Sequence, residues 1–128
     1  MLIFGHKFIE SKEFIKIDSI DDIKLTSSNS IVLLKGLKEP FNMAIYCHKN
    51  GLEYGVEVSS LKEAIFANSL GASYAICEFS LAKELQKLAD NYLWDMKILA
   101  IVDSDKEIDG IAKVFIDGIV YRNSIRRL

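Results

Sequence analysis

The sequence has few of the residues that crosslink, kink or anchor a chain. It contains 2 cysteines, 1 proline and 1 tryptophan in 128 residues. Cys47 and Cys77 stand in apolar surroundings, without CxxC spacing and without a nearby run of histidines. This pattern excludes a disulfide framework and a zinc module, and it predicts two buried thiols. Reduced thiols of this kind are typical of a cytoplasmic protein.

Long apolar runs and an excess of basic charge are also missing. No segment approaches the ~18 consecutive apolar residues of a membrane helix, and the first four residues are too short an apolar run for a signal peptide. The formal net charge is -2, so the electrostatic footprint of a nucleic-acid-binding protein is absent. The one basic cluster, Arg122, Arg126 and Arg127, is expected to be a solvated end of the chain. We therefore expect a soluble cytoplasmic protein that binds neither nucleic acid nor membrane.

The composition is that of a globular protein. Hydrophobic residues make up 50% of the chain and charged residues 27%, which excludes a disordered chain and a coiled coil. No linker or low-complexity segment divides the sequence. Residues 1–128 are therefore predicted to form a single α/β domain.

From Ser30 onward, short apolar runs alternate with amphipathic stretches. Ser60 with Glu63, and Ser104 with Glu107, have the spacing of a helix capping box. Regular alternation of strand and helix is typical of right-handed βαβ crossovers and a buried parallel sheet. The pattern predicts strands at 31–34, 54–58, 72–77, 97–102 and 118–121, and helices at 41–49, 61–70, 81–93 and 106–114.

These elements predict a three-layer α/β fold with a mainly parallel sheet of about five strands and helices on both faces. The first thirty residues are less regular: residues 8–9 and 14–17 indicate an irregular hairpin or two edge strands, and residues 19–25 a short capped helix. An open half-barrel is the alternative fold. It would leave sheet edges and an apolar face exposed, which would favour a homodimer.

A charged residue lies at the carboxyl end of each predicted strand, at near-regular intervals. These ends share one rim of a parallel sheet, where ligands of α/β folds bind. Three carboxylates on one rim would suit Mg²⁺ or general acid–base catalysis, and two cations would hold a phosphate or carboxylate. The alternative is that polar residues mark the change from sheet to solvated loop, with no site at all. The candidate catalytic residues are Glu57, Glu78 and Asp103, and the candidate ligand-binding residues are Lys35 and Arg122.

Glu57 is the most informative of these residues. It lies between Val56 and Val58 in a predicted interior strand, and a carboxylate there needs a partner or an opening into a cavity. Both faces of a doubly wound sheet are packed, whereas a half-barrel would let Glu57 face a cavity. The direction of this side chain therefore distinguishes the two folds.

Two family resemblances arise from these segments. The chain from Gly55-Val56-Glu57-Val58 through Leu70-Gly71-Ala72 to residues 116–120 resembles the later strand–helix units of phosphate-binding (βα)₈ barrels. That resemblance implies catalytic groups at Glu57 and Lys35, although the glycine-rich phosphate loop is absent and the chain is too short for a closed barrel of ~250 residues.

The segments 67–74 and 78–81 are similar to the C-terminal part of receiver domains. Lys35 or Gly36 stands where a receiver has its phosphoacceptor aspartate, and Glu78 replaces the usual lysine. This second resemblance therefore implies a fold rather than phosphorylation.

Two functional hypotheses follow from the sequence. The absence of a catalytic motif favours a small non-enzymatic module, without a cofactor, that binds a protein partner, regulates one or associates with itself. The other hypothesis is an enzyme, or the remnant of one, that acts on a small phosphorylated or carboxylated compound through the three carboxylates, with Mg²⁺ as its cofactor. The sequence leaves both open.

Overall fold

The computed structural model describes residues 1–128 and contains one eight-stranded sheet. The strand order is β1-β7-β6-β5-β4-β3-β2-β8, and every pair of neighbours is parallel. The predicted parallel sheet is confirmed, but it has eight strands rather than five. Their bounds are β1 Leu2–Phe4, β2 Glu13–Ile17, β3 Ser30–Leu34, β4 Tyr54–Glu57, β5 Tyr74–Cys77, β6 Lys97–Val102, β7 Gly118–Tyr121 and β8 Arg126–Arg127.

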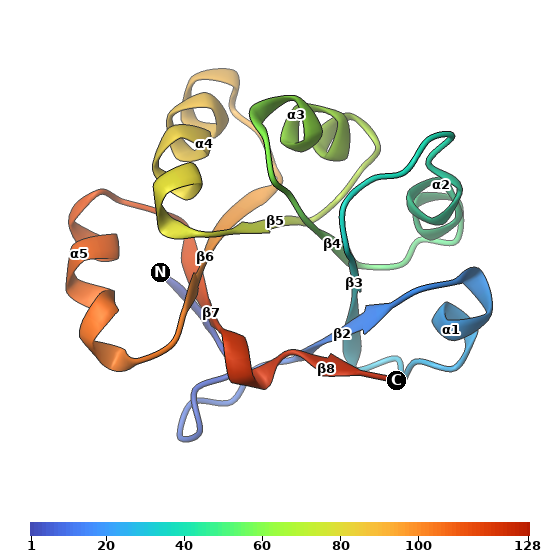
Figure 1. The fold of residues 1–128 in the computed structure, drawn as a ribbon, viewed down its shortest axis with the longest axis horizontal. Helices are drawn as coiled ribbons and strands as arrows, with labels where there is room; N and C mark the ends of the chain where they lie inside the picture. The colour runs from blue at the N-terminus through green and yellow to red at the C-terminus, as the bar shows by residue number, and fades with distance from the viewer.

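The sheet curls into a half-barrel with the helices on its outer side (Figure 1). β7 lies next to β1 at one end of the strand order, whereas β8 lies at the other end beside β2. Only residues 122–125 separate β7 from β8 along the chain. This short connection brings the two ends of the sheet together. The expected three-layer arrangement is therefore wrong, and the half-barrel alternative describes the fold.

The concave face of the sheet is packed with apolar side chains. Because side chains alternate along a strand, every second strand residue points inward. The rings of Phe4 and Phe14 meet edge to face with their centroids 5.1 Å apart. This interior is a filled core and not an exposed apolar face, which removes the reason given above for a dimer. Its buried residues are Phe4, Phe14, Ile31, Leu33, Ile76, Leu99, Ile101 and Val120.

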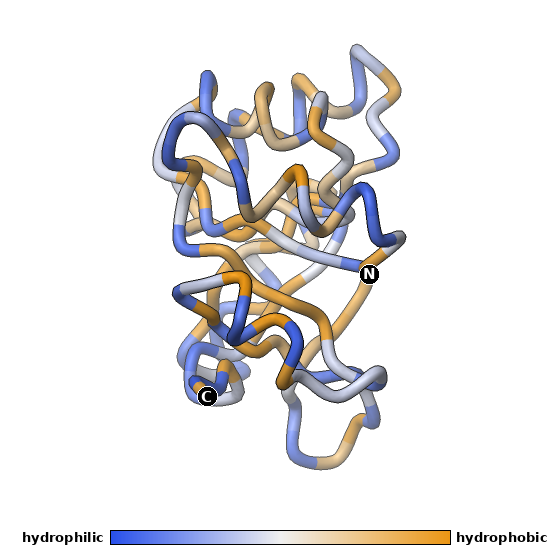
Figure 2. Tube along the Cα trace, turned by 90° about the vertical axis from the view of Figure 1, so that its right-hand side faces the viewer, coloured by the Kyte–Doolittle hydropathy of each residue, from blue (hydrophilic) through white to orange (hydrophobic).

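The convex face packs against the helices through a larger cluster of 24 buried residues. Hydrophobic and hydrophilic residues alternate along the outer segments of the chain, as expected for helices with one buried face (Figure 2). None of the helices has both the length and the hydrophobicity needed to cross a membrane. The helices are α1 Ile20–Lys24, α2 Asn42–Lys49, α3 Leu61–Ser69, α4 Phe79–Tyr92 and α5 Ile108–Lys113, with 3₁₀ turns η1 Asp105–Glu107 and η2 Arg122–Ser124.

Serine caps begin three of the helical segments. At η1 both halves of the predicted capping box form between Ser104 and Glu107. At α3 the Ser60 hydroxyl accepts from the Glu63 amide, but the Glu63 carboxylate accepts from the amides of Ser59 and Leu37 instead. Glu63 therefore ties the loop after β3 to the start of α3.

The predicted N-terminal hairpin is wrong. β1 pairs with β7, and β2 pairs with β3 and β8, all in parallel. The intervening loop, residues 5–12, is long enough to let the two strands join different parts of the sheet. The predicted strand at residues 8–9 lies in this loop, where Phe8 is exposed. The short helix predicted at residues 19–25 is confirmed as α1, with Ser19 as its N-cap.

Candidate functional site

A small cavity lies at the mouth of the half-barrel, where the strands end. Its volume is about 230 Å³, and four of its six lining residues are charged: Lys16, Glu57, Arg122 and Arg127. Lys16 follows Phe14 by two residues, so the alternation of β2 directs both side chains inward. Ile101 and Ile125 form the apolar part of the wall. The charged side chains around the cavity thus cover one end of the inner apolar core.

Lys16 and Glu57 form an ion pair inside this mouth. Lys16 Nζ lies 3.1 Å from Glu57 Oε2, and the two side chains are only 18% and 30% exposed. Glu57 Oε2 is buried, and it has no hydrogen-bond partner besides this ammonium group. The charge of Glu57 is therefore compensated by Lys16.

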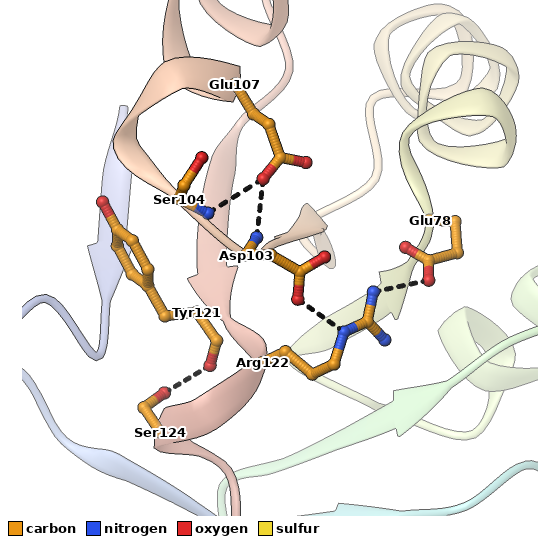
Figure 3. Close-up of polar contacts among 7 residues, drawn as sticks. All are labelled: Glu78, Asp103, Ser104, Glu107, Tyr121, Arg122 and Ser124. Atoms are coloured by element: carbon orange, nitrogen blue, oxygen red, sulfur yellow. Dashed lines mark hydrogen bonds and ion pairs between the residues drawn. The ribbon is translucent and has the colours of Figure 1, made fainter.

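Arg122 lies between the ends of two other strands (Figure 3). Its Nε donates to Asp103 Oδ1 at 2.8 Å, and its Nη2 donates to Glu78 Oε1 at 2.8 Å. The hydrogen bonds to Asp103 and then Glu78 raise the pKa of Arg122 further above its already high value. Arg122 is thus a permanent cation that joins the ends of β5, β6 and β7.

The structure brings four of the five sequence-predicted site residues together around Arg122. Asp103 and Glu78 pair with its guanidinium group, and Glu57 lines the same cavity as Arg122. Lys35 follows β3, is exposed and makes no ion pair. The three carboxylates do not converge: no group of three His, Cys, Asp or Glu residues is placed to hold a metal ion. Their arrangement therefore gives no support to a Mg²⁺ site.

Sequence reasoning missed two of the lining residues, Lys16 and Arg127. The sequence pattern places Lys16 in a hairpin or an edge strand, and Arg127 at a solvated end of the chain. The alternation of Phe14, Ile15 and Lys16 was the available signal, because it places Lys16 on the same face as a large apolar residue. Arg127 carried no local signal, since it lies opposite Lys16 only through long-range pairing.

A second cavity of about 540 Å³ lies next to the loop after β1. The Tyr121 hydroxyl donates to Asp105 Oδ1, and His6 Nε2 lies 3.7 Å from the same oxygen. The amide of Phe8 donates to His6 Nδ1, so Nε2 carries the proton. The hydrogen bond from Tyr121 lowers the pKa of Asp105, whereas burial and then that bond raise the pKa of Tyr121 to about 12.

These shifts move Asp105 and Tyr121 away from proton transfer near neutral pH. Asp105 and Tyr121 therefore serve this cavity as hydrogen-bonding groups rather than as an acid or a base. Neither His6 nor Asp105 was a candidate on the sequence alone, because they are joined only by the approach of β1 to β7.

No protein-family model matches the chain, and no curated protein sequence is significantly similar to it. The class of protein is therefore defined by its fold and its site. It is a half-barrel of parallel βα units with a charged mouth at the carboxyl ends of its strands.

Proposed function

We propose that this protein binds a small anionic compound, a carboxylate or a phosphate, at the mouth of the half-barrel. The observation that carries the proposal is the inward-facing Lys16, which lines the cavity and whose side chain is 18% exposed. Arg122 and Arg127 line the same cavity, whereas Glu57 is its only carboxylate. Three of the four charged side chains of the lining thus carry N–H donors in a partly desolvated place, which suits an anionic ligand.

The arginines have carboxylate partners that a ligand would have to compete with. Arg122 pairs with Glu78 and Asp103, and Arg127 with Asp18 at 3.3 Å. All three carboxylates are exposed and lie outside the cavity lining. Exposed ion pairs contribute about 0–1 kcal/mol each, so they hold the guanidinium groups in position without preventing contact with a ligand.

The location of the cavity is consistent with this function. In parallel α/β folds, ligands bind at the carboxyl ends of the strands, because the connecting loops there are free to carry binding groups. The apolar core below the mouth is fully packed. It would hold Lys16 and Glu57 in place, which reduces the entropy lost on binding.

Isothermal titration calorimetry with propionate and with inorganic phosphate tests the proposal. We expect saturable binding of at least one of them to the wild-type protein, and a weakening of about tenfold or more in Lys16→Gln, since a charge-assisted hydrogen bond contributes about 1.5–3 kcal/mol. Lys12→Gln is the matched control, because Lys12 pairs with Glu53 at 2.9 Å at the opposite end of the same strands. Failure of both anions to bind, or equal weakening by the two variants, would contradict the proposal.

One observation favours a second candidate function, self-association of the chain. Leu93 and Phe115 follow α4 and α5 and have left-handed backbones, with φ of 55° and 60°. Glycine is preferred in this conformation, yet these two large apolar side chains are 85% and 82% exposed. A second copy of the chain that covers both side chains would explain why large apolar residues occupy these two positions.

Sedimentation velocity across a range of concentrations tests this second candidate. We expect a wild-type dimer that dissociates in the double variant Leu93→Gly/Phe115→Gly, in which glycine retains the backbone conformation without strain. Phe8→Ala is the control, because Phe8 is equally exposed at the other end of the molecule. A wild-type protein that stays monomeric at every concentration would exclude the candidate.

A further inference from the structure

The cavity of about 540 Å³ beside the loop after β1 lies at the same end of the sheet as the mouth of the half-barrel. Its lining comes from three segments that follow neighbouring strands: residues 5–7 after β1, 121–124 at the end of β7 and 103–105 after β6. Ligands of parallel α/β folds bind at this end of the strands. The two cavities share no lining residue, so this one is a separate candidate site.

The charges around this cavity nearly balance. Lys7 and Asp105 line it with opposite signs. Asp103 also belongs to the lining, but its carboxylate points to Arg122, which pairs with Glu78 as well (Figure 3). Two further charges of opposite sign lie next to the cavity on η1 and outside its lining: Lys106 and Glu107. Neither an anion nor a cation is favoured by this arrangement, which suits a neutral ligand.

Uncharged hydrogen-bonding groups make up much of the rest of the lining. The amide group of Asn123 offers both a donor and an acceptor. The Ser124 hydroxyl donates to the carbonyl oxygen of Tyr121 and can still accept. His6 carries its proton on Nε2, because its Nδ1 accepts from the amide of Phe8. A ligand that both donates and accepts at several positions matches this lining, and hydroxyl groups have that property.

Asp105 and Tyr121 provide a fixed acceptor and an aromatic surface. The Tyr121 hydroxyl donates to Asp105 Oδ1, and His6 Nε2 lies 3.7 Å from the same oxygen. The carboxylate is thus held through one oxygen and can accept from a ligand through the other. The rings of Tyr121 and His6 meet edge to face with their centroids 5.5 Å apart. An aromatic ring in a polar cavity gives the CH groups of a ligand an apolar surface to pack on.

From these groups we infer that the cavity binds a neutral polyhydroxylated compound, a monosaccharide or a cyclic polyol. Its hydroxyl groups would donate to Asp105 and exchange hydrogen bonds with Asn123, and its ring would lie beside Tyr121. The volume of about 540 Å³ equals the space of about eighteen water molecules in the liquid, at ~30 Å³ each. This space holds one six-membered ring together with ordered water. The site is distinct from the anion site proposed above and does not depend on it.

Titration with glucose, ribose and myo-inositol, followed by two-dimensional ¹H–¹⁵N NMR, tests the inference. We expect at least one of these compounds to shift the amide signals of residues 104–105 and 123–124 in a saturable manner. Cyclohexanol has a six-membered ring with a single hydroxyl group, so it should not bind. Glucosamine and glucuronate add a positive and a negative charge to the glucose skeleton, and neither should bind more tightly than glucose.

Two asparagine variants assign the binding to this cavity. Asn123 is exposed and lines the cavity, so Asn123→Ala should leave the fold intact and weaken binding about three- to tenfold, the effect of one or two hydrogen bonds. Asn91→Ala is the matched control. Asn91 is also exposed, but it lies on α4, where its amide group donates to the carbonyl oxygen of Lys87. This variant should bind as tightly as the wild type.

The possible outcomes decide the inference without reference to the mouth of the half-barrel. If none of the three compounds binds, or if cyclohexanol binds as tightly as they do, the cavity is not a site for polyhydroxylated compounds. Tighter binding of glucosamine or glucuronate than of glucose would overturn the choice of a neutral ligand. Equal weakening by the two asparagine variants would place the binding elsewhere. Lys16→Gln, which tests the anion site, should leave the binding of the neutral compound unchanged.

Discussion

Gly118 is a residue at which the half-barrel leaves no room for a side chain. A Cβ atom there would lie 2.6 Å from the carbonyl oxygen of Leu2 and 2.8 Å from a methyl group of Leu99. Glycine therefore allows β1 to approach β7 closely. We predict that Gly118→Ala lowers the free energy of unfolding by about 1–3 kcal/mol, the usual cost of overpacking a core. Urea denaturation followed by circular dichroism measures this change.

Gly110 provides the matched control for that substitution. It lies within α5, and a Cβ atom there would meet no atom within 4 Å. Alanine has a higher helix propensity than glycine, so Gly110→Ala should raise the free energy of unfolding by about 0.5–1 kcal/mol. If the two substitutions had effects of the same sign, close packing at β1 would not be the reason for Gly118.

The thiol of Cys77 makes stability dependent on pH in the alkaline range. Burial, and then the charge of Glu78, raise its pKa from the ordinary 9.0 to about 12. Above pH 9 the unfolded chain loses this proton while the folded chain keeps it, so stability falls as pH rises. The decrease approaches about 1.4 kcal/mol per pH unit for this group before it ends near the folded pKa.

Urea denaturation of wild type and Cys77→Ala at pH 8, 9 and 10 checks this prediction. The variant should be less stable at pH 8, because a buried side chain has been shortened, but its stability should decline less steeply with pH. Parallel pH profiles for the two proteins would show that the Cys77 proton makes no contribution. The interval below pH 10 is chosen because burial also raises the pKa of Tyr54 and Tyr74, to about 12.

The capping box of η1 is the clearest local signal at the scale of single elements. Ser104 and Glu107 exchange side-chain and backbone hydrogen bonds at the start of a short helical segment. We predict that Ser104→Ala lowers the free energy of unfolding by about 1 kcal/mol, the typical cost of removing an N-cap. Chemical denaturation measures the loss, and Ser28→Ala, in an exposed loop, should leave stability unchanged. A loss shared by both variants would contradict a specific cap at Ser104.

The elements from Ser30 onward were predictable because their signals are local. β6 and β7 have the bounds that their apolar runs predict, and α1 begins at the serine cap predicted for it. β1 and β8 were not predictable in the same way. Each is only two or three residues long and is held by pairing with a strand far away in sequence, which leaves no periodic pattern to detect.

At the scale of the whole molecule, the same distinction applies to the site. The rim at the strand ends was predictable, because parallel strands share one direction, and so was the need of the Glu57 carboxylate for a partner. The identity of that partner was not predictable. Lys16 lies on β2 and Glu57 at the end of β4, with β3 between them in the sheet, so their contact depends on long-range strand pairing rather than on any single segment.

β8 therefore contributes more to the shape of the sheet than its length of two residues suggests. Arg126 and Arg127 pair with Ile15 and Lys16 of β2, and Arg126 Nε lies 2.7 Å from Glu13. Ile125 packs against the inner core. Together these contacts bring the far end of the sheet against β2 and form part of the wall around the cavity.

Removal of residues 125–128 should open the half-barrel where β8 pairs with β2. We predict a loss of about 2–4 kcal/mol in the free energy of unfolding, from burial of one isoleucine and a few backbone hydrogen bonds. Amide hydrogen exchange should increase first in β2, whose residues 15 and 16 would lose their partners. Removal of Leu128 alone, which is exposed, should change neither measurement. If exchange instead increased evenly over all strands, β8 would stabilise the fold as a whole, and the sheet would curl without it.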